Sequence, residues 1–184
     1  HRAVIIIIGG WLLLPVAKFD LPGLPPFTKD VAISIGLFLG GHFSGQRQRS
    51  YFRWRSYDIP IILWCLSPIF TGQSNQLGLY AGLSGAYEQI MSWGIPYRAG
   101  GIYFHSSEAQ WDLCMGIVVG GMLYALLCLY EIRMSPRLNV ILYGFFAHDW
   151  SQHKRYGGWR PIVFMQHGLM VSVWMAAATS TAFW

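Results

Sequence analysis

The chain has 184 residues, of which 54% are hydrophobic and 11% are charged, with a formal net charge of +5 and a mean hydropathy of +0.37. A soluble domain carries about 25% charged residues, so this composition indicates an integral membrane protein and argues against a soluble one. On so apolar a chain, the small positive charge favours contact with membrane lipid headgroups or anionic lipid-linked substrates, and no nucleic acid is expected as a partner.

The length leaves room for about five to six spanning helices, because each needs roughly 20 residues. We therefore predict an all-α fold, a polytopic bundle of transmembrane helices that forms a single domain over residues 1–184. The chain begins with His1 rather than Met and runs to Trp184 without a polar tail. We expect a fragment of a larger protein, truncated at both ends.

Six apolar segments follow one another along the chain, at residues 3–17, 31–43, 59–71, 77–104, 111–130 and 161–184. The second segment is short for a span, and the fourth is rich in glycine and contains Glu88 and Arg98. The fifth is the best candidate span, and its Gly120-Gly121 pair is suited to close contact between helices.

Two basic loops give conflicting signals about topology. The loop before the third segment carries four arginines against Asp58, which predicts a cytoplasmic location. Three crossings then place the loop after the fifth segment outside, although it is also basic. Its cations are Arg133, Arg137, Lys154, Arg155 and Arg160. Either the fourth segment is re-entrant and this loop is cytoplasmic, or the loop is external and its cations serve a function.

The second basic loop is also the best candidate for a binding site. It begins with an interfacial stretch, VILYGFFAHDW, at residues 140–150. Arginine suits phosphate because its planar guanidinium donates bidentate hydrogen bonds. The Gly157-Gly158 pair lets backbone N–H groups approach an anion. Two interpretations stay open: a diphosphate or headgroup site, and an ordinary basic loop that binds acidic lipids.

Three ionisable residues, Glu88, Arg98 and His167, are predicted at or near membrane depth. Ionisable side chains are costly there, so each of them is a candidate functional residue. The alternatives are ion pairs with other helices, an arginine that reaches the interface, and a histidine that is hydrogen-bonded between helices. His148 and His153 do not match a zinc motif, and no paired cysteines support one. We therefore predict no metal site.

Four short motifs lie close together in the last third of the chain: E-x-R-M-S-P at residues 131–136, Y-G-F-F-x-H at 143–148, R-x-G-G-x-R-P at 155–161 and H-G-L at 167–169. Together with the upstream strings DIPIILWCLSPI, SNQLGLYAGLS and WGIPYRAGGIYF, they resemble the bacterial O-antigen ligase-like family. This family includes O-antigen polymerases and related glycan ligases. The resemblance covers residues 58–184, about two thirds of the chain.

The resemblance implies a GT-C-like, multi-pass protein of the bacterial inner membrane, acting in O-antigen and lipopolysaccharide biosynthesis. Such a protein moves a glycan from an undecaprenyl-diphosphate carrier to an acceptor on the periplasmic face, without a cofactor. The family's acceptor-activating histidine lies in a later external loop, so we expect no catalytic residue in this fragment. The residues implied for diphosphate binding are Arg98, Arg155 and Arg160, and the supporting candidates are His148, His153, Lys154 and His167.

A rival hypothesis is a non-catalytic membrane component, such as part of a polysaccharide transporter or flippase, or an assembly subunit. This hypothesis suits a chain in which no complete catalytic site is evident. A transporter is expected to have repeated halves with broken helices, and the sequence contains no such repeat.

Overall fold

A computed structural model describes residues 2–20, 22–23, 25–43, 55–147, 153–155 and 157–184, with only the backbone described for 41–43 and 155. The predicted all-α class is confirmed, since 74% of the structure is helical. The chain divides into two compact units, one made of residues 1–17 and 110–184 and the other of residues 18–109.

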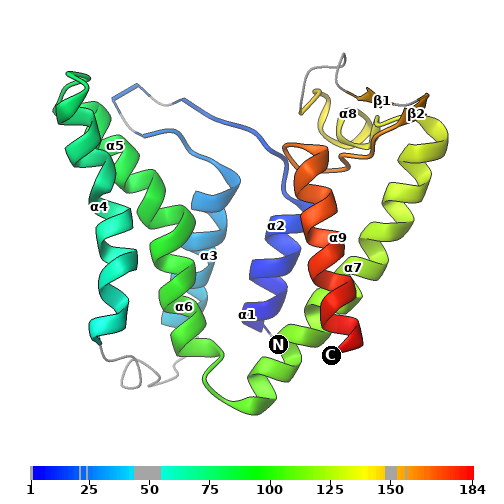
Figure 1. Ribbon diagram of the computed structural model, residues 1–184, viewed down its shortest axis with the longest axis horizontal. Coiled ribbons are helices and arrows are strands. Elements are labelled where there is room, and N and C mark those ends of the chain that lie inside the picture. The colour runs from blue at the N-terminus through cyan, green and yellow to red at the C-terminus, as the bar shows by residue number, and fades with distance from the viewer. Residues whose placement is uncertain (1, 21, 24, 44–54, 148–152, 156) are drawn as a thin grey trace. The chain divides into compact units, whose positions relative to one another are not determined.

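The first unit is organised around one long helix, α7 (Ser107–Met134). A short helical segment packs against it, formed by α1 (Arg2–Val4), a π-helical turn (Ile5–Gly9) and α2 (Gly10–Leu13). The last helix, α9 (Gly168–Phe183), lies along α7 on another face (Figure 1). Trp11 and Trp174 bring the first segment and α9 into contact, with ring centroids 5.4 Å apart.

Glycines on α7 allow its neighbours to approach closely. Gly116 faces Val4 and Ile8, and a Cβ at Gly120 would lie 3.0 Å from the Leu12 side chain. A Cβ at Gly121 would overlap that of Ala178 on α9. The close contact predicted at Gly120-Gly121 is therefore confirmed.

These contacts also fix the directions of the helices. Residues 4 and 8 lie against Gly116, and residues 8 and 12 lie against Gly120, one turn later on α7. The first helical segment therefore runs parallel to α7. The contact between Gly121 and Ala178, near the end of α9, and the contacts of the α9 entry with the end of α7 show that α9 runs antiparallel. Figure 1 shows the same arrangement.

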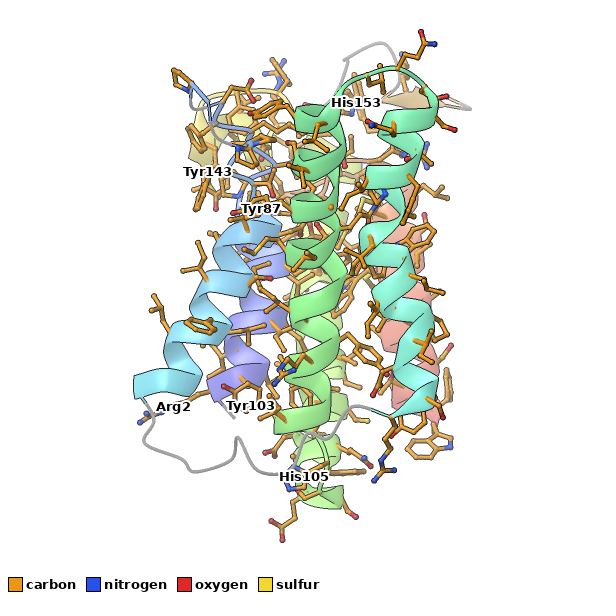
Figure 2. The ribbon with its side chains drawn as sticks, turned by 90° about the vertical axis from the view of Figure 1, so that its left-hand side faces the viewer. Arg2, Tyr87, Tyr103, His105, Tyr143 and His153 are labelled. Carbon is orange, nitrogen blue, oxygen red and sulfur yellow. The ribbon has the colours of Figure 1, made fainter. Side chains whose placement is uncertain are left out.

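The C-terminal end of α7 carries the non-helical part of the first unit. Here lie α8 (Leu138–Tyr143) and a hairpin of β1 (Lys154–Arg155) and β2 (Gly158–Trp159). In Figure 2, Tyr143 and His153 mark this end, and Arg2 marks the opposite one. The Tyr143 hydroxyl donates to the carbonyl of Leu13, which places the end of α2 here as well. We call residues 135–147, 153–155 and 157–167 the loop end of the first unit.

The second unit contains α3 (Lys29–Phe43), α4 (Ile59–Ser74) and one continuous helical stretch. This stretch consists of α5 (Leu79–Gln89), a π-helical turn (Ile90–Gly94) and α6 (Ile95–Tyr103). The helices α4 and α5 meet through glycine, since a Cβ at Gly72 would lie 2.9 Å from the Cα of Gly82.

Two polar contacts tie the continuous stretch to its neighbours in the second unit. Buried Asp58, just before α4, accepts hydrogen bonds from the Arg55 N–H at 2.7 Å and from the Tyr97 hydroxyl at 2.6 Å. Buried Ser34, on α3, donates to the carbonyl of Met91 in the π-helical turn at 2.5 Å. The π-helical turn therefore lies where α3 reaches the long stretch.

The predicted number of spans is not supported by the helices. Of those described, α7 is the one long and apolar enough to cross a membrane, while Arg2–Leu13 and Gly168–Phe183 are apolar but shorter. The helices α3, α4 and α9 have 15 or 16 residues, and such a helix is only about 24 Å long. A membrane core is about 30 Å thick. The Leu79–Tyr103 stretch is long but rich in glycine and polar residues.

The sixth apolar segment, predicted over residues 161–184, is wrong at its start. Helix α9 begins only at Gly168, and residues 162–165 form a buried, non-helical strap. The reason is a tertiary contact, because two side chains of α7 accept hydrogen bonds from the backbone of this strap.

Candidate functional site

A buried carboxylate organises the loop end of the first unit. Glu131, in the last turn of α7, is only 1% exposed. One of its oxygens accepts hydrogen bonds from the N–H groups of Ile162 and Val163, each at 2.8 Å. The other accepts from the N–H of Leu138 at 3.1 Å. A negative charge at a helix C-terminus is unfavourable by itself, and these three donors offset that cost and the cost of burial.

Tyr124 completes the arrangement from two turns earlier on α7. Seven residues separate it from Glu131, so both side chains share one face of the helix. Its buried hydroxyl accepts from the N–H of Phe164 at 3.0 Å and donates to the carbonyl of Ile162 at 3.5 Å. Two side chains of α7 thus satisfy four polar backbone groups of residues 162–164, which buried backbone requires. We call Tyr124 and Glu131 together the clasp.

The clasp holds a strained conformation. Val163 has a φ of 55°, in the left-handed region that a β-branched residue rarely adopts. The side chains of the strap, Ile162, Val163, Phe164 and Met165, are all buried. Strain of this kind persists only where the surroundings over-determine it. The strap therefore has one defined path between the hairpin and α9.

The hairpin leads directly into this strap. Its strands pair Lys154 with Trp159 and Arg155 with Gly158, and Gly157 turns the chain with a φ of 79°. Partners across an antiparallel pair share a face, and the Lys154 ammonium lies 5.8 Å from the centre of the Trp159 ring. The pairing extends one step further, since the Arg160 N–H donates to the carbonyl of His153 at 2.8 Å.

Arg160 lies at the entrance of α9. A Cβ on Gly168, the first residue of α9, would lie 2.8 Å from Cδ and 2.9 Å from Cγ of Arg160, and closer still to its Nε. The half-buried Arg160 side chain thus passes directly over the first turn of α9. His167 caps the same turn, because its Nδ1 accepts from the Leu169 N–H at 3.1 Å.

The structure brings only some of the sequence-predicted site residues together. Arg160, His167, buried His153 and exposed Lys154 all lie at the loop end. The backbone of Arg155 lies in β1, and its side chain is outside the described part, as is the whole of His148. Arg98 is exposed on α6 and belongs to the second unit.

Sequence reasoning missed the clasp. In the sequence, Glu131 stands out only as the first residue of the E-x-R-M-S-P motif, and Tyr124 is one residue of an apolar segment. The available signal was the spacing of seven residues, which puts a tyrosine and a carboxylate on one face at the end of an otherwise apolar helix. What the spacing does not reveal is which backbone groups they bind, because residues 162–164 are about 30 positions away in sequence.

Among the residues that the structure describes, no three His, Cys, Asp or Glu side chains gather closely enough to hold a metal ion. Comparison of the chain with protein-family models, with curated proteins and with solved structures finds no match.

Proposed function

We propose that this chain is part of a membrane glycan ligase or polymerase of the O-antigen ligase-like kind. It acts in the bacterial inner membrane and transfers a glycan from an undecaprenyl-diphosphate carrier. The four sequence motifs support the family, and the loop end of the first unit supports the site, because three of those motifs contribute Glu131, Arg160 and His167 to it.

A membrane location is supported by the distribution of side chains on α7. Its buried residues are small or polar, namely Gly120, Gly121, Tyr124, Cys128 and Glu131. Its exposed residues are large and apolar, including Trp111, Met115, Val119, Met122, Leu126 and Leu129. Helices in membranes pack through small residues in this way, and an apolar stripe of this length on a soluble protein is an aggregation liability. The long helix therefore favours lipid as its surroundings.

The proposed site rests on one observation, the position of the Arg160 side chain over the first turn of α9. The residue is half-buried, and no carboxylate within the described ranges forms a salt bridge with it. The N-terminus of α9 adds a partial positive charge at the same place. A guanidinium at a helix N-terminus suits a multiply charged anion, and the diphosphate of a lipid-linked glycan is such an anion.

The chemistry required of this site is electrostatic. In transfer, the bond from the sugar carbon to the diphosphate oxygen breaks, and a bond from that carbon to the acceptor oxygen forms. The diphosphate leaves with the electron pair, and Arg160 stabilises the negative charge that develops on it. The acceptor's proton goes to a base that the family resemblance places in a later loop.

The proposal is tested in the full-length protein with Arg160→Ala and Arg155→Ala. The matched control is Arg133→Ala, an exposed arginine near the end of α7. We expect the site variants to slow glycan transfer by about 10²–10³-fold, with unchanged amounts in the membrane and a normal control. Normal transfer in both site variants would refute the diphosphate site. Translocation of the lipid-linked glycan without transfer would instead support the transporter alternative.

A further inference from the structure

The clasp has a role that the proposed site does not yet explain. A buried carboxylate at the end of a membrane-length helix is costly, and a hydrophobic contact could have held α9 against α7. Instead, Glu131 and Tyr124 bind backbone groups of one short segment, Ile162 to Phe164. They determine the path of the chain rather than simply adding packing.

That path joins the two residues at the entrance of α9. Arg160 precedes the strap and His167 follows it, and the Arg160 side chain returns to lie over Gly168. If the strap were helical, α9 would begin earlier and its first turn would no longer lie beneath Arg160. The hydrogen bonds of the clasp are therefore what place the guanidinium at the first turn of α9.

We propose that Glu131 and Tyr124 are positioning residues for the anion site, which hold Arg160 against the first turn of α9 so that it meets the diphosphate of the lipid-linked substrate. This inference rests on the proposed function, because the anion is taken from it. Neither residue touches the substrate. Both act through the backbone of Ile162, Val163 and Phe164.

The test uses the full-length protein in detergent micelles, with undecaprenyl diphosphate as the probe. The variants are Glu131→Gln and Tyr124→Phe, which keep the size of each side chain. The matched controls are Glu108→Gln and Tyr130→Phe, at exposed positions of the same helix. Arg160→Ala is included as the reference for a damaged anion site. Two quantities are measured, the affinity for the probe and the hydrogen exchange of the amides of residues 162–164.

In both clasp variants we expect the amides of residues 162–164 to exchange faster. We also expect each variant to bind the probe about tenfold more weakly, since the lost hydrogen bonds involve a charged or buried group. The controls should match the wild type in both measurements. Unchanged exchange in Glu131→Gln and Tyr124→Phe would overturn the clasp whatever the ligand.

The two proposals fail in different ways. If Arg160→Ala weakens binding while the clasp variants exchange faster but bind normally, the positioning role is overturned and the diphosphate site stands. If Arg160→Ala binds as tightly as the wild type, the diphosphate site is overturned, and the positioning role falls with it. A merely structural role would change exchange and thermal stability without changing affinity.

Discussion

At the scale of single residues, Gly168 determines where the Arg160 guanidinium can lie. The Arg160 side chain occupies the space that a Cβ on residue 168 would fill, so its position depends on a glycine there. We predict that Gly168→Ala displaces Arg160 and weakens binding of undecaprenyl diphosphate about tenfold, as the loss of a charge-assisted hydrogen bond does. Alanine is the better helix former, so the stability of α9 should not fall. Equilibrium binding to the purified full-length protein measures the effect.

A double-mutant cycle makes this prediction specific. In an Arg160→Ala background the three atoms nearest to the added methyl group are absent, so Gly168→Ala should have no further effect on affinity. Gly100→Ala on α6 is the control, because a Cβ at that position has open space around it. Additive losses from the two substitutions would show that Gly168 does not act through Arg160.

The hydroxyl of Tyr97 is a second single group with a structural consequence, this time in the second unit. It donates to the buried carboxylate of Asp58 and so ties α6 to the turn before α4. We predict that Tyr97→Phe lowers the free energy of unfolding by about 1.5–3 kcal/mol, the usual worth of a hydrogen bond to a charged group. Tyr80→Phe, on the exposed side of α5, should change it little. Denaturant titration in mixed micelles compares the two, and equal stabilities would contradict the prediction.

At the scale of elements, the packing of α7 against α9 depends on the absence of a side chain at Gly121. A Cβ there would overlap that of Ala178. We predict that Gly121→Ala destabilises the protein by about 1–3 kcal/mol through overpacking, and that adding Ala178→Gly restores most of the loss. Leu123→Val, at an exposed position of α7, is the control. Thermal unfolding compares the wild type with these three variants. If adding Ala178→Gly did not restore stability, the two residues would not be in contact.

The elements themselves could be predicted from local sequence to a large extent. Apolar runs and turn residues indicate the longer helical segments but not α8, and the Gly120-Gly121 pair indicates a helix contact. The prediction of a span over residues 161–184 is wrong at residues 161–167, where apolar side chains indicated the start of a helix. Their conformation is decided by hydrogen bonds from Glu131 and Tyr124. A tertiary contact of this kind leaves no periodic signal in the segment that it controls.

The candidate site could be predicted only in part, for the same reason. Residue chemistry pointed to Arg160 and His167, because arginine suits phosphate and ionisable residues near membrane depth need an explanation. Residue chemistry did not indicate that both residues lie at the first turn of α9. That placement follows from the strap, whose path depends on α7. The predicted number of spans is not supported, because apolar runs do not reveal helix length and, of the described helices, α7 is the one long and apolar enough to cross a membrane.

At the scale of the whole molecule, the first unit bears on the topology conflict between the two basic loops. The end of α2 and the loop end lie together, since Tyr143 binds the carbonyl of Leu13. The first helical segment and α7 also run parallel. In a membrane, the chain from residue 18 to residue 106 must then return to the other side, which takes an odd number of crossings. If the fourth segment were re-entrant, only two crossings would remain between these residues, those of α3 and α4. In that case α7 would run antiparallel to the first helical segment.

We therefore predict an odd number of crossings between residues 18 and 106, a cytoplasmic location for residues 45–56 and a hairpin that faces the periplasm. The test uses Ser50→Cys and Ser151→Cys, both at positions outside the described residues, in a background without the three native cysteines. In intact spheroplasts, an impermeant thiol reagent should label only Ser151→Cys. Ser50→Cys should react once the membrane is permeabilised. Equal protection of both would mean that the fourth segment is re-entrant and that Arg160 faces the cytoplasm, where no periplasmic transfer takes place.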